Sequence, residues 1–140
     1  MALELGSLQK AIASYEELFN LMNDKKFMGK LNAVAKKGIK AGLIKNFEFT
    51  YELCWKFMKR WLEQVAESSF LDGMTKKELF RMAAEHHLIG NVKVWFEYHE
   101  YRNETAHTYN EETAEKVYKA ARRFFKDAKA FLKNLEAKND

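Results

Sequence analysis

One long helical pattern, between Leu43 and Ala66, constrains the fold of this chain more than any other feature. Apolar side chains recur there at alternating three- and four-residue steps, which places them on one face of an α-helix. The residues of this first stripe are Ile44, Phe47, Tyr51, Cys54, Met58, Trp61 and Val65. A second apolar stripe consists of Phe49, Leu53 and Phe57. Because a helix that is apolar on two sides is buried on two sides, the second stripe is expected either to face a second copy of the chain or to lie inside the monomer.

The composition also favours long helices with few connections. The 140 residues include no proline and only 6 glycines, whereas many short strands joined by tight turns need both residue types. Further helices are predicted from their apolar spacing and their N-cap residues. They are expected to run from Ser7 to Met22, from Thr75 (with Glu78 in a capping box) to about His87, from Asn91 to about Thr105, and from Asn110 to the tail.

The predicted architecture is all-α, an up-and-down bundle of four to five helices in one domain spanning residues 1–140. The segment 25–41 is ambiguous because glycines interrupt it, and a short helix or a mobile connection is expected there. Its candidate inward-facing residues are Phe27, Leu31, Val34 and Ile39. Residues 68–73 are expected to form a loop, and Gly90 is expected to cap the C-terminus of the helix before Asn91.

Several classes of protein are disfavoured by the sequence. No apolar run approaches the ~18 residues of a membrane span, and the N-terminus lacks a signal-peptide pattern. The single cysteine, Cys54, lies in an apolar stripe and suits a reducing compartment, so a cytoplasmic location is expected. His99-Glu100 begins like a zinc motif, but residue 103 is Asn, and no glycine-rich phosphate loop follows a strand. Neither a metal nor a cofactor is therefore expected.

Positive charge is concentrated in one segment. The formal net charge is +4, and no acidic residue occurs between Asp24 and Glu48, although this segment is rich in lysine. Such a run is typical either of a solvated helix face or of a surface for RNA or an acidic partner. The candidate RNA or phosphate ligands are Lys36, Lys37, Lys40 and Lys45.

The stretch with the clearest chemistry is YRNETAHTY, residues 101–109. Arg102 is a permanent cation whose donors fit a phosphate, His107 can accept and return a proton near neutral pH, and Asn103 adds a neutral donor and acceptor. Residues five apart lie about 140° apart on a helix. Arg102 and His107 therefore need a helix end between them, or a site assembled from two chains. Because a new helix starts at Asn110, His107 and Tyr109 are predicted to lie in a turn.

The spacing Arg-Asn-x3-His-x-Tyr resembles the R-x4-H-x-Y motif of the HEPN superfamily, and more closely its HepT-like branch, also described as nucleotidyltransferase substrate-binding proteins. Residues 47–64 resemble the second long helix of that family, and residues 95–118 resemble its motif helix, turn and last helix. The resemblance spans most of the chain and weakens at residues 24–44 and 67–77.

This resemblance implies a HEPN-like homodimer that acts as a metal-independent endoribonuclease toxin, with Arg102, Asn103 and His107 as catalytic residues. It also implies a small nucleotidyltransferase partner, acting as the antitoxin, that silences the chain by attaching AMP to Tyr109. The principal alternative is a non-catalytic subunit that presents a substrate to that nucleotidyltransferase. A third possibility is an adaptor that uses only its aromatic helix surface.

A purely structural role of the motif also remains open from the sequence. Arg102 would then stack on Tyr98 and pair with Glu100 or Glu104, and His107 would only hold the turn. Tyr109 would pack its ring under the turn and bond to the backbone through its hydroxyl.

Overall fold

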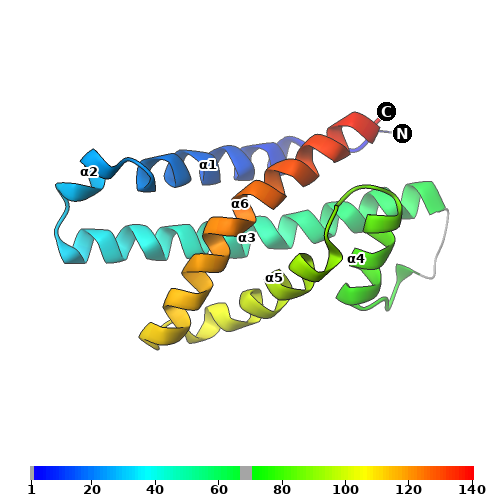
Figure 1. The fold of residues 1–140 in the computed structure, drawn as a ribbon. Helices are drawn as coiled ribbons and strands as arrows, with labels where there is room; N and C mark the ends of the chain where they lie inside the picture. The colour runs from blue at the N-terminus through cyan, green and yellow to red at the C-terminus, as the bar shows by residue number, and fades with distance from the viewer. Residues whose placement is uncertain (1, 67–70) are drawn as a thin grey trace.

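The computed structural model describes residues 2–66 and 71–140 (Figure 1). Within these residues the chain is helical and contains no strand, which confirms the predicted all-α bundle. The helices are α1 (Gly6–Met22), α2 (Lys25–Gly29), α3 (Ala33–Ala66), α4 (Lys76–Glu85), α5 (Val92–Glu104) and α6 (Glu111–Lys138). A short 3-10 helix, η2 (Thr105–His107), lies between α5 and α6. No helix in the described ranges is long and apolar enough to cross a membrane.

The long helix α3 runs through the whole molecule and contacts most of the other helices (Figure 1). Helices α1 and α6 pack against it and against each other, α4 packs against its second half, and α5 packs against its middle. The two chain ends lie side by side, because the Leu3 amide donates to Asn139 Oδ1 at 2.8 Å and the Asn139 amide donates to the Leu3 carbonyl at 2.9 Å. The fold is thus closed at one end by its termini, while the connection between α5 and α6 lies at the other end (Figure 1).

Aromatic rings from three helices form the centre of the core. Phe124 of α6 contacts Phe47 of α3 and Tyr98 of α5, with ring centroids 5.2 Å and 4.9 Å away. All three side chains are almost completely buried. Large buried rings in edge-to-face contact contribute more than their buried area alone. This cluster therefore fixes how α5 and α6 lie on α3, and with them the turn that connects the two.

The two apolar stripes of α3 have different environments. The first stripe is buried as predicted, except that Val65 is 46% exposed. On the second stripe Phe57 is buried within the monomer and Leu53 packs partly against the core, whereas Phe49 is 59% exposed. The monomer alone covers one end of this stripe and leaves Phe49 open.

The start of α3 differs from the sequence prediction. The helix begins at Ala33, ten residues before the expected Leu43, so the ambiguous segment is mostly regular helix. The Asn32 side chain accepts a hydrogen bond from the Ala35 amide at 2.8 Å and thereby caps this start. Helix propagation is cooperative, so lysine and alanine neighbours can offset the cost of an interior glycine. Val34 was expected to face inward, which was wrong, because it is 80% exposed.

Three of the predicted N-cap residues cap their helices in the structure. Side chains of Thr75, Asn91 and Asn110 accept hydrogen bonds from the first turns of α4, α5 and α6, as predicted. The helix predicted from Ser7 to Met22 is present as α1, but Ser7 does not cap it, because α1 starts at Gly6 and the Glu4 carboxylate accepts a hydrogen bond from the Gly6 amide.

The predicted cap at Gly90 was also wrong, because α4 ends before that glycine is reached. His87 takes the left-handed conformation instead, with φ 61°, and lets the Leu88 amide bond back to the Ala83 carbonyl at 2.9 Å. Leu88 is completely buried, and its burial favours this earlier ending. Part of the loop predicted at residues 68–73 lies outside the described residues.

Candidate functional site

The site is the connection between α5 and α6, which contains the second half of the motif. The Thr105 hydroxyl donates to the Arg102 carbonyl at 2.7 Å, at the point where α5 gives way to η2. Asn110 then accepts from the Thr113 amide at 3.1 Å and starts α6. The prediction that Arg102 projects from the last turn of a helix while His107 and Tyr109 lie in the following turn is confirmed.

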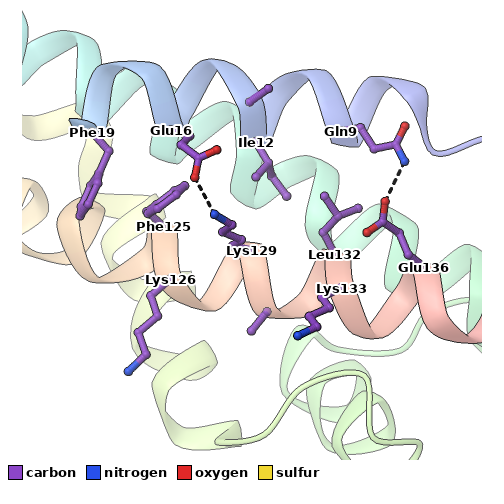
Figure 2. Close-up of a pocket in the computed structure, with 12 residues that line it drawn as sticks. Gln9, Ile12, Glu16, Phe19, Phe125, Lys126, Lys129, Leu132, Lys133 and Glu136 are labelled. Carbon is purple, nitrogen blue, oxygen red and sulfur yellow. Dashed lines mark hydrogen bonds and ion pairs between the residues drawn. The ribbon is translucent and has the colours of Figure 1, made fainter. Parts of the chain in front are cut away.

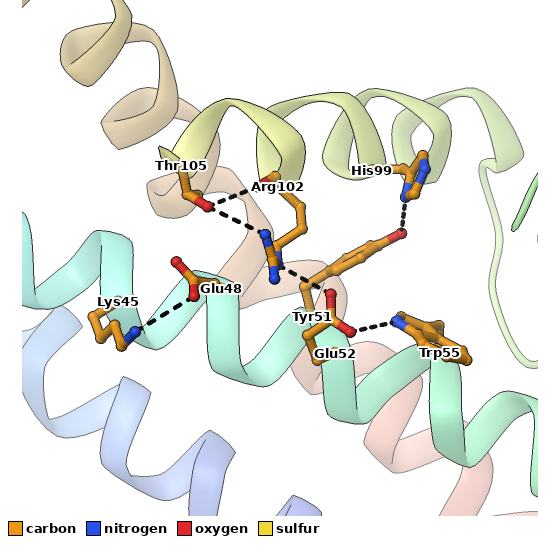
Figure 3. Close-up of polar contacts among 8 residues, drawn as sticks. All are labelled: Lys45, Glu48, Tyr51, Glu52, Trp55, His99, Arg102 and Thr105. Atoms are coloured by element: carbon orange, nitrogen blue, oxygen red, sulfur yellow. Dashed lines mark hydrogen bonds and ion pairs between the residues drawn. The ribbon is translucent and has the colours of Figure 1, made fainter. Parts of the chain in front are cut away.

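Arg102 points from α5 onto α3, where it meets a carboxylate (Figure 3). Its Nε lies 3.0 Å from Glu52 Oε1, and its Nη1 donates to Thr105 Oγ1 at 3.3 Å. The Nε contact is an ion pair without hydrogen-bond geometry, because that N–H has no aligned acceptor. The expected partners Glu100 and Glu104 were therefore wrong. Tyr98, the expected stacking surface, is buried instead and donates its hydroxyl to Asp127.

Glu52 is also held in place by a residue of its own helix. Its second oxygen, Oε2, accepts a hydrogen bond from Trp55 Nε1 at 3.0 Å (Figure 3). The Lys76 ammonium lies 3.7 Å from the centroid of the Trp55 ring. Both carboxylate oxygens thus have partners, while the Arg102 and Glu52 side chains are 29% and 32% exposed. An ion pair of this exposure is partly screened by water, so its guanidinium can exchange one anion for another.

A second polar contact ties α5 to α3 beside this pair. The Tyr51 hydroxyl lies 2.8 Å from His99 Nδ1 (Figure 3). Burial raises the pKa of Tyr51 well above its usual range, so the hydroxyl keeps its proton. Burial lowers the pKa of His99, and the positive charge of Lys76 lowers it further. A neutral His99 ring can therefore accept a hydrogen bond from the Tyr51 hydroxyl at Nδ1, which makes this contact structural.

His107, Asn103 and Tyr109 are all exposed to solvent. The His107 and Tyr109 rings lie 6.0 Å apart, centroid to centroid, at an interplanar angle of 77°. Tyr109 is 84% exposed, so the alternative in which its ring packs under the turn was wrong. No hydrogen bond or ion pair joins Arg102 to His107 within the residues that the structure describes. The turn therefore presents an imidazole and a phenol to solvent, next to a guanidinium that is anchored on α3.

Three of the four predicted phosphate-binding lysines share one groove. Lys36, Lys37 and Lys40 line a hollow of about 560 Å³ between α3 and the first turns of α6, and Thr108 of the motif turn also lines it. Lys40 pairs with Glu115 at 3.3 Å. Lys45 lies outside this groove and pairs with Glu48 at 3.4 Å.

A larger groove, of about 720 Å³, lies between α1 and α6 and includes no residue of the motif (Figure 2). Its polar rim is bridged by Lys129, which donates to Glu16 at 2.6 Å, and by Gln9, which donates to Glu136 at 2.9 Å. Phe19 and Phe125 stack beneath this rim with centroids 4.6 Å apart. The groove is a seam between two packed helices, and no histidine, cysteine or aspartate of the described residues lines it.

The described part of the chain contains no cluster of three or more His, Cys, Asp or Glu side chains able to hold a metal ion. Cys54 is completely buried, and burial raises the pKa of its thiol, so it is a core residue as predicted.

Sequence reasoning missed Glu52 and Thr105. Thr105 had a usable signal, because a threonine three residues after the arginine can bond back to the end of a helix. Glu52 had only a weak one, namely a single acid between the apolar Tyr51 and Leu53. Its partnership with Arg102 depends on how α3 packs against α5, which no spacing within one helix reveals.

Comparisons with known proteins give matches over almost the whole chain. Residues 3–137 match the family described as nucleotidyltransferase substrate binding protein like. The probable ribonuclease HepT of Haemophilus influenzae is 33% identical over 138 residues, covering 98% of this chain and 94% of that relative. A solved Haemophilus influenzae structure, described as revealing the fold of a substrate binding domain of a nucleotidyltransferase, has a TM-score of 0.90 at 32% identity and covers 95% of this chain and 99% of its own. A Thermus thermophilus structure shares the fold, with a TM-score of 0.71 at 24% identity over 91% of this chain and 98% of its own.

Proposed function

This chain belongs to the nucleotidyltransferase substrate binding protein like family, and we propose that it is a HEPN-type, metal-independent endoribonuclease regulated by a small nucleotidyltransferase. The observation that carries the proposal is the solvent-exposed His107 on the turn that follows Arg102. His107 can transfer a proton near neutral pH, and Arg102 at the end of the preceding helix supplies a cation that fits a phosphate. The probable ribonuclease activity of the HepT relative supports this choice.

The chemistry needs two copies of the chain. Cleavage of RNA requires one group to remove the proton of the ribose 2′-hydroxyl and another to protonate the leaving 5′-oxygen. Each chain supplies one His107 in this motif. A homodimer in which two such turns face one groove supplies both groups.

In this dimer the reaction is a transesterification. One His107 takes the 2′-hydroxyl proton, the 2′-oxygen forms a bond to phosphorus, and the bond from phosphorus to the 5′-oxygen breaks. The partner's His107 gives its proton to that 5′-oxygen, which leaves as a hydroxyl. Arg102 stabilises the negative charge on the phosphoryl oxygens, and the Asn103 amide donates a hydrogen bond to one of them. The products are a 2′,3′-cyclic phosphate and a 5′-hydroxyl end.

Tyr109 is the proposed point of control, because its side chain is 84% exposed and its ring contacts His107. A nucleotidyltransferase of the toxin–antitoxin type would join the Tyr109 oxygen to the α-phosphorus of ATP, with pyrophosphate leaving. The new phosphodiester would carry negative charge beside His107 and repel the RNA backbone. Lys36, Lys37 and Lys40 border this turn and are proposed to contact the RNA backbone, whereas Lys45 is directed to Glu48.

The second candidate function is a non-catalytic subunit that docks onto the nucleotidyltransferase and presents substrate to it. The ion pair between Arg102 and Glu52 favours this function, because a guanidinium that already has a carboxylate partner holds a phosphate less strongly.

One assay separates the two functions. Purified protein is incubated with single-stranded RNA in the presence of a chelator, alongside His107→Ala and Arg102→Ala. Loss of the acid–base group should lower the cleavage rate by about 100-fold or more. The matched control is His87→Asn, which removes an exposed histidine at the end of α4 and tolerates the left-handed backbone there. Cleavage by wild type no faster than by His107→Ala would refute the ribonuclease and leave the docking subunit.

A further inference from the structure

A basic hollow lies between α5 and α6. It has a volume of about 430 Å³ and is lined by Tyr101, Lys116, Lys119, Arg122 and Arg123. The basic residues span eight positions of α6, or about 10 Å along the helix axis. No acidic side chain lines it. We call this hollow the α5–α6 groove.

Arg122 of the α5–α6 groove has no acidic partner within the described residues. Its Nη2 donates to Asn23 Oδ1 at 2.8 Å, and its Nη1 donates to the Tyr118 hydroxyl at 3.2 Å. Both partners are neutral, so they orient the guanidinium without cancelling its charge. Lys119 is exposed and has no ion pair within the described residues. The groove therefore contains two cations that lack a counter-charge.

The other two cations are only loosely compensated. Lys116 lies 3.7 Å from Glu112, and Arg123 lies 3.6 Å from Glu97. All four side chains are about half exposed or more. Pairs of this kind contribute little in water, so an incoming anion can displace the carboxylates at small cost.

We propose that the α5–α6 groove binds the sugar–phosphate backbone of single-stranded RNA and leads the strand to the motif turn. Four basic side chains in a row suit consecutive phosphates, and Tyr101 offers a ring on which a base can stack. Tyr101 precedes Arg102 directly, so the groove and the Arg102–Glu52 pair lie on two sides of the same turn of α5. The inference rests on the proposed function for its choice of ligand, and it extends the substrate path beyond the motif to α6.

The test measures binding separately from cleavage. In a His107→Ala background, fluorescence anisotropy measures the affinity for a labelled 12-nucleotide RNA between about 50 and about 200 mM salt. Phosphate contacts dominate affinity under these conditions, and each contact contributes about 0.7 to the slope of log affinity against log salt concentration. The double change Lys116→Glu with Lys119→Glu is compared with Lys126→Glu with Lys133→Glu. The two pairs lie on the same helix and change the net charge equally, but the control residues line the α1–α6 groove of Figure 2. Circular dichroism melts check that both variants fold.

Reversing two charges of the α5–α6 groove, with Lys116→Glu and Lys119→Glu, should weaken RNA binding by about tenfold and lower the salt slope by about 1.4. The control pair should change the affinity far less. Equal losses in both variants would mean that diffuse charge attracts the RNA, and would overturn the proposal. Failure of the proposed function is a separate result. If RNA binding depends on this groove but the wild-type protein never cleaves RNA, only the ribonuclease proposal is refuted. If the protein cleaves RNA and charge reversal in the groove leaves KM unchanged, only the groove proposal is refuted.

Discussion

At the scale of single residues, Arg102 differs from its neighbours in the motif because its charge is already paired within the protomer. Glu52 occupies the side of the guanidinium that a phosphate would use, at 3.0 Å from Nε. The pair is about one-third exposed, so it contributes at most ~1 kcal/mol to stability. Glu52 thus anchors Arg102, and in the proposed function it would also compete with the substrate phosphate for that guanidinium.

This dual role of Glu52 predicts a gain of RNA affinity on neutralisation. Glu52→Gln keeps an acceptor for Trp55 but releases the Arg102 charge. In the His107→Ala background, the Kd for RNA should fall by about three- to tenfold, the equivalent of one restored charge-assisted contact. The matched control is Glu48→Gln, one turn earlier on α3, which frees Lys45 instead. Equal effects of the two changes would show that Arg102 does not contact the RNA.

At the scale of elements, α3 has 34 residues and carries two glycines in its first half, Gly38 and Gly42. A Cβ at Gly38 would meet nothing within 4 Å, whereas a Cβ at Gly42 would lie 3.4 Å from a methyl carbon of Leu18. The first glycine therefore weakens the helix without improving its packing. This half of α3 also carries the lysines that border the motif turn.

Gly38→Ala should raise the free energy of unfolding by about 0.5–1 kcal/mol, because alanine has less backbone freedom to lose in the unfolded chain. Urea denaturation measures the change. Gly73→Ala is the opposite control, since Gly73 has φ 82° and alanine there should cost about 1 kcal/mol. If Gly38→Ala fails to stabilise, the first half of α3 is not a regular helix in solution.

At the scale of the whole molecule, the proposed reaction depends on a second copy of the chain. Phe49 is 59% exposed and lies one helical turn from Glu52, so a partner seated on Phe49 would lie next to the Arg102–Glu52 pair. This position makes the exposed end of the second stripe of α3 the best candidate for the dimer face.

Phe49→Asp should convert a dimer into a monomer, because a charge buried at an apolar contact is strongly unfavourable. Size-exclusion chromatography with light scattering measures the mass. The control is Val34→Asp on the same helix, which also replaces an exposed apolar residue, about 22 Å away along the axis. If the wild-type protein is a monomer, the proposed dimer does not form. If Phe49→Asp is still a dimer, the interface lies elsewhere on the chain.

The motif illustrates how far sequence reasoning reached. The change of helix between Arg102 and His107 followed from a five-residue spacing and from the cap at Asn110, both of which are local. The length of α3 did not, because glycines lower local propensity while cooperative growth of the helix overrides it. The left-handed capping residue of α4 was misplaced for a related reason, since burial of Leu88 favoured a left-handed His87 over the later Gly90.

By itself the sequence determined the helical class, the buried stripe of α3, the caps at Thr75, Asn91 and Asn110, and the residues of the motif. Each of these depends on residues within a few positions of one another. Only the tertiary structure decided that Arg102 pairs with Glu52, that Phe57 is covered while Phe49 is not, and that four cations of α6 share a groove with Tyr101. Those relations join helices distant in sequence, and they are set by how the aromatic core orients α5 and α6 on α3.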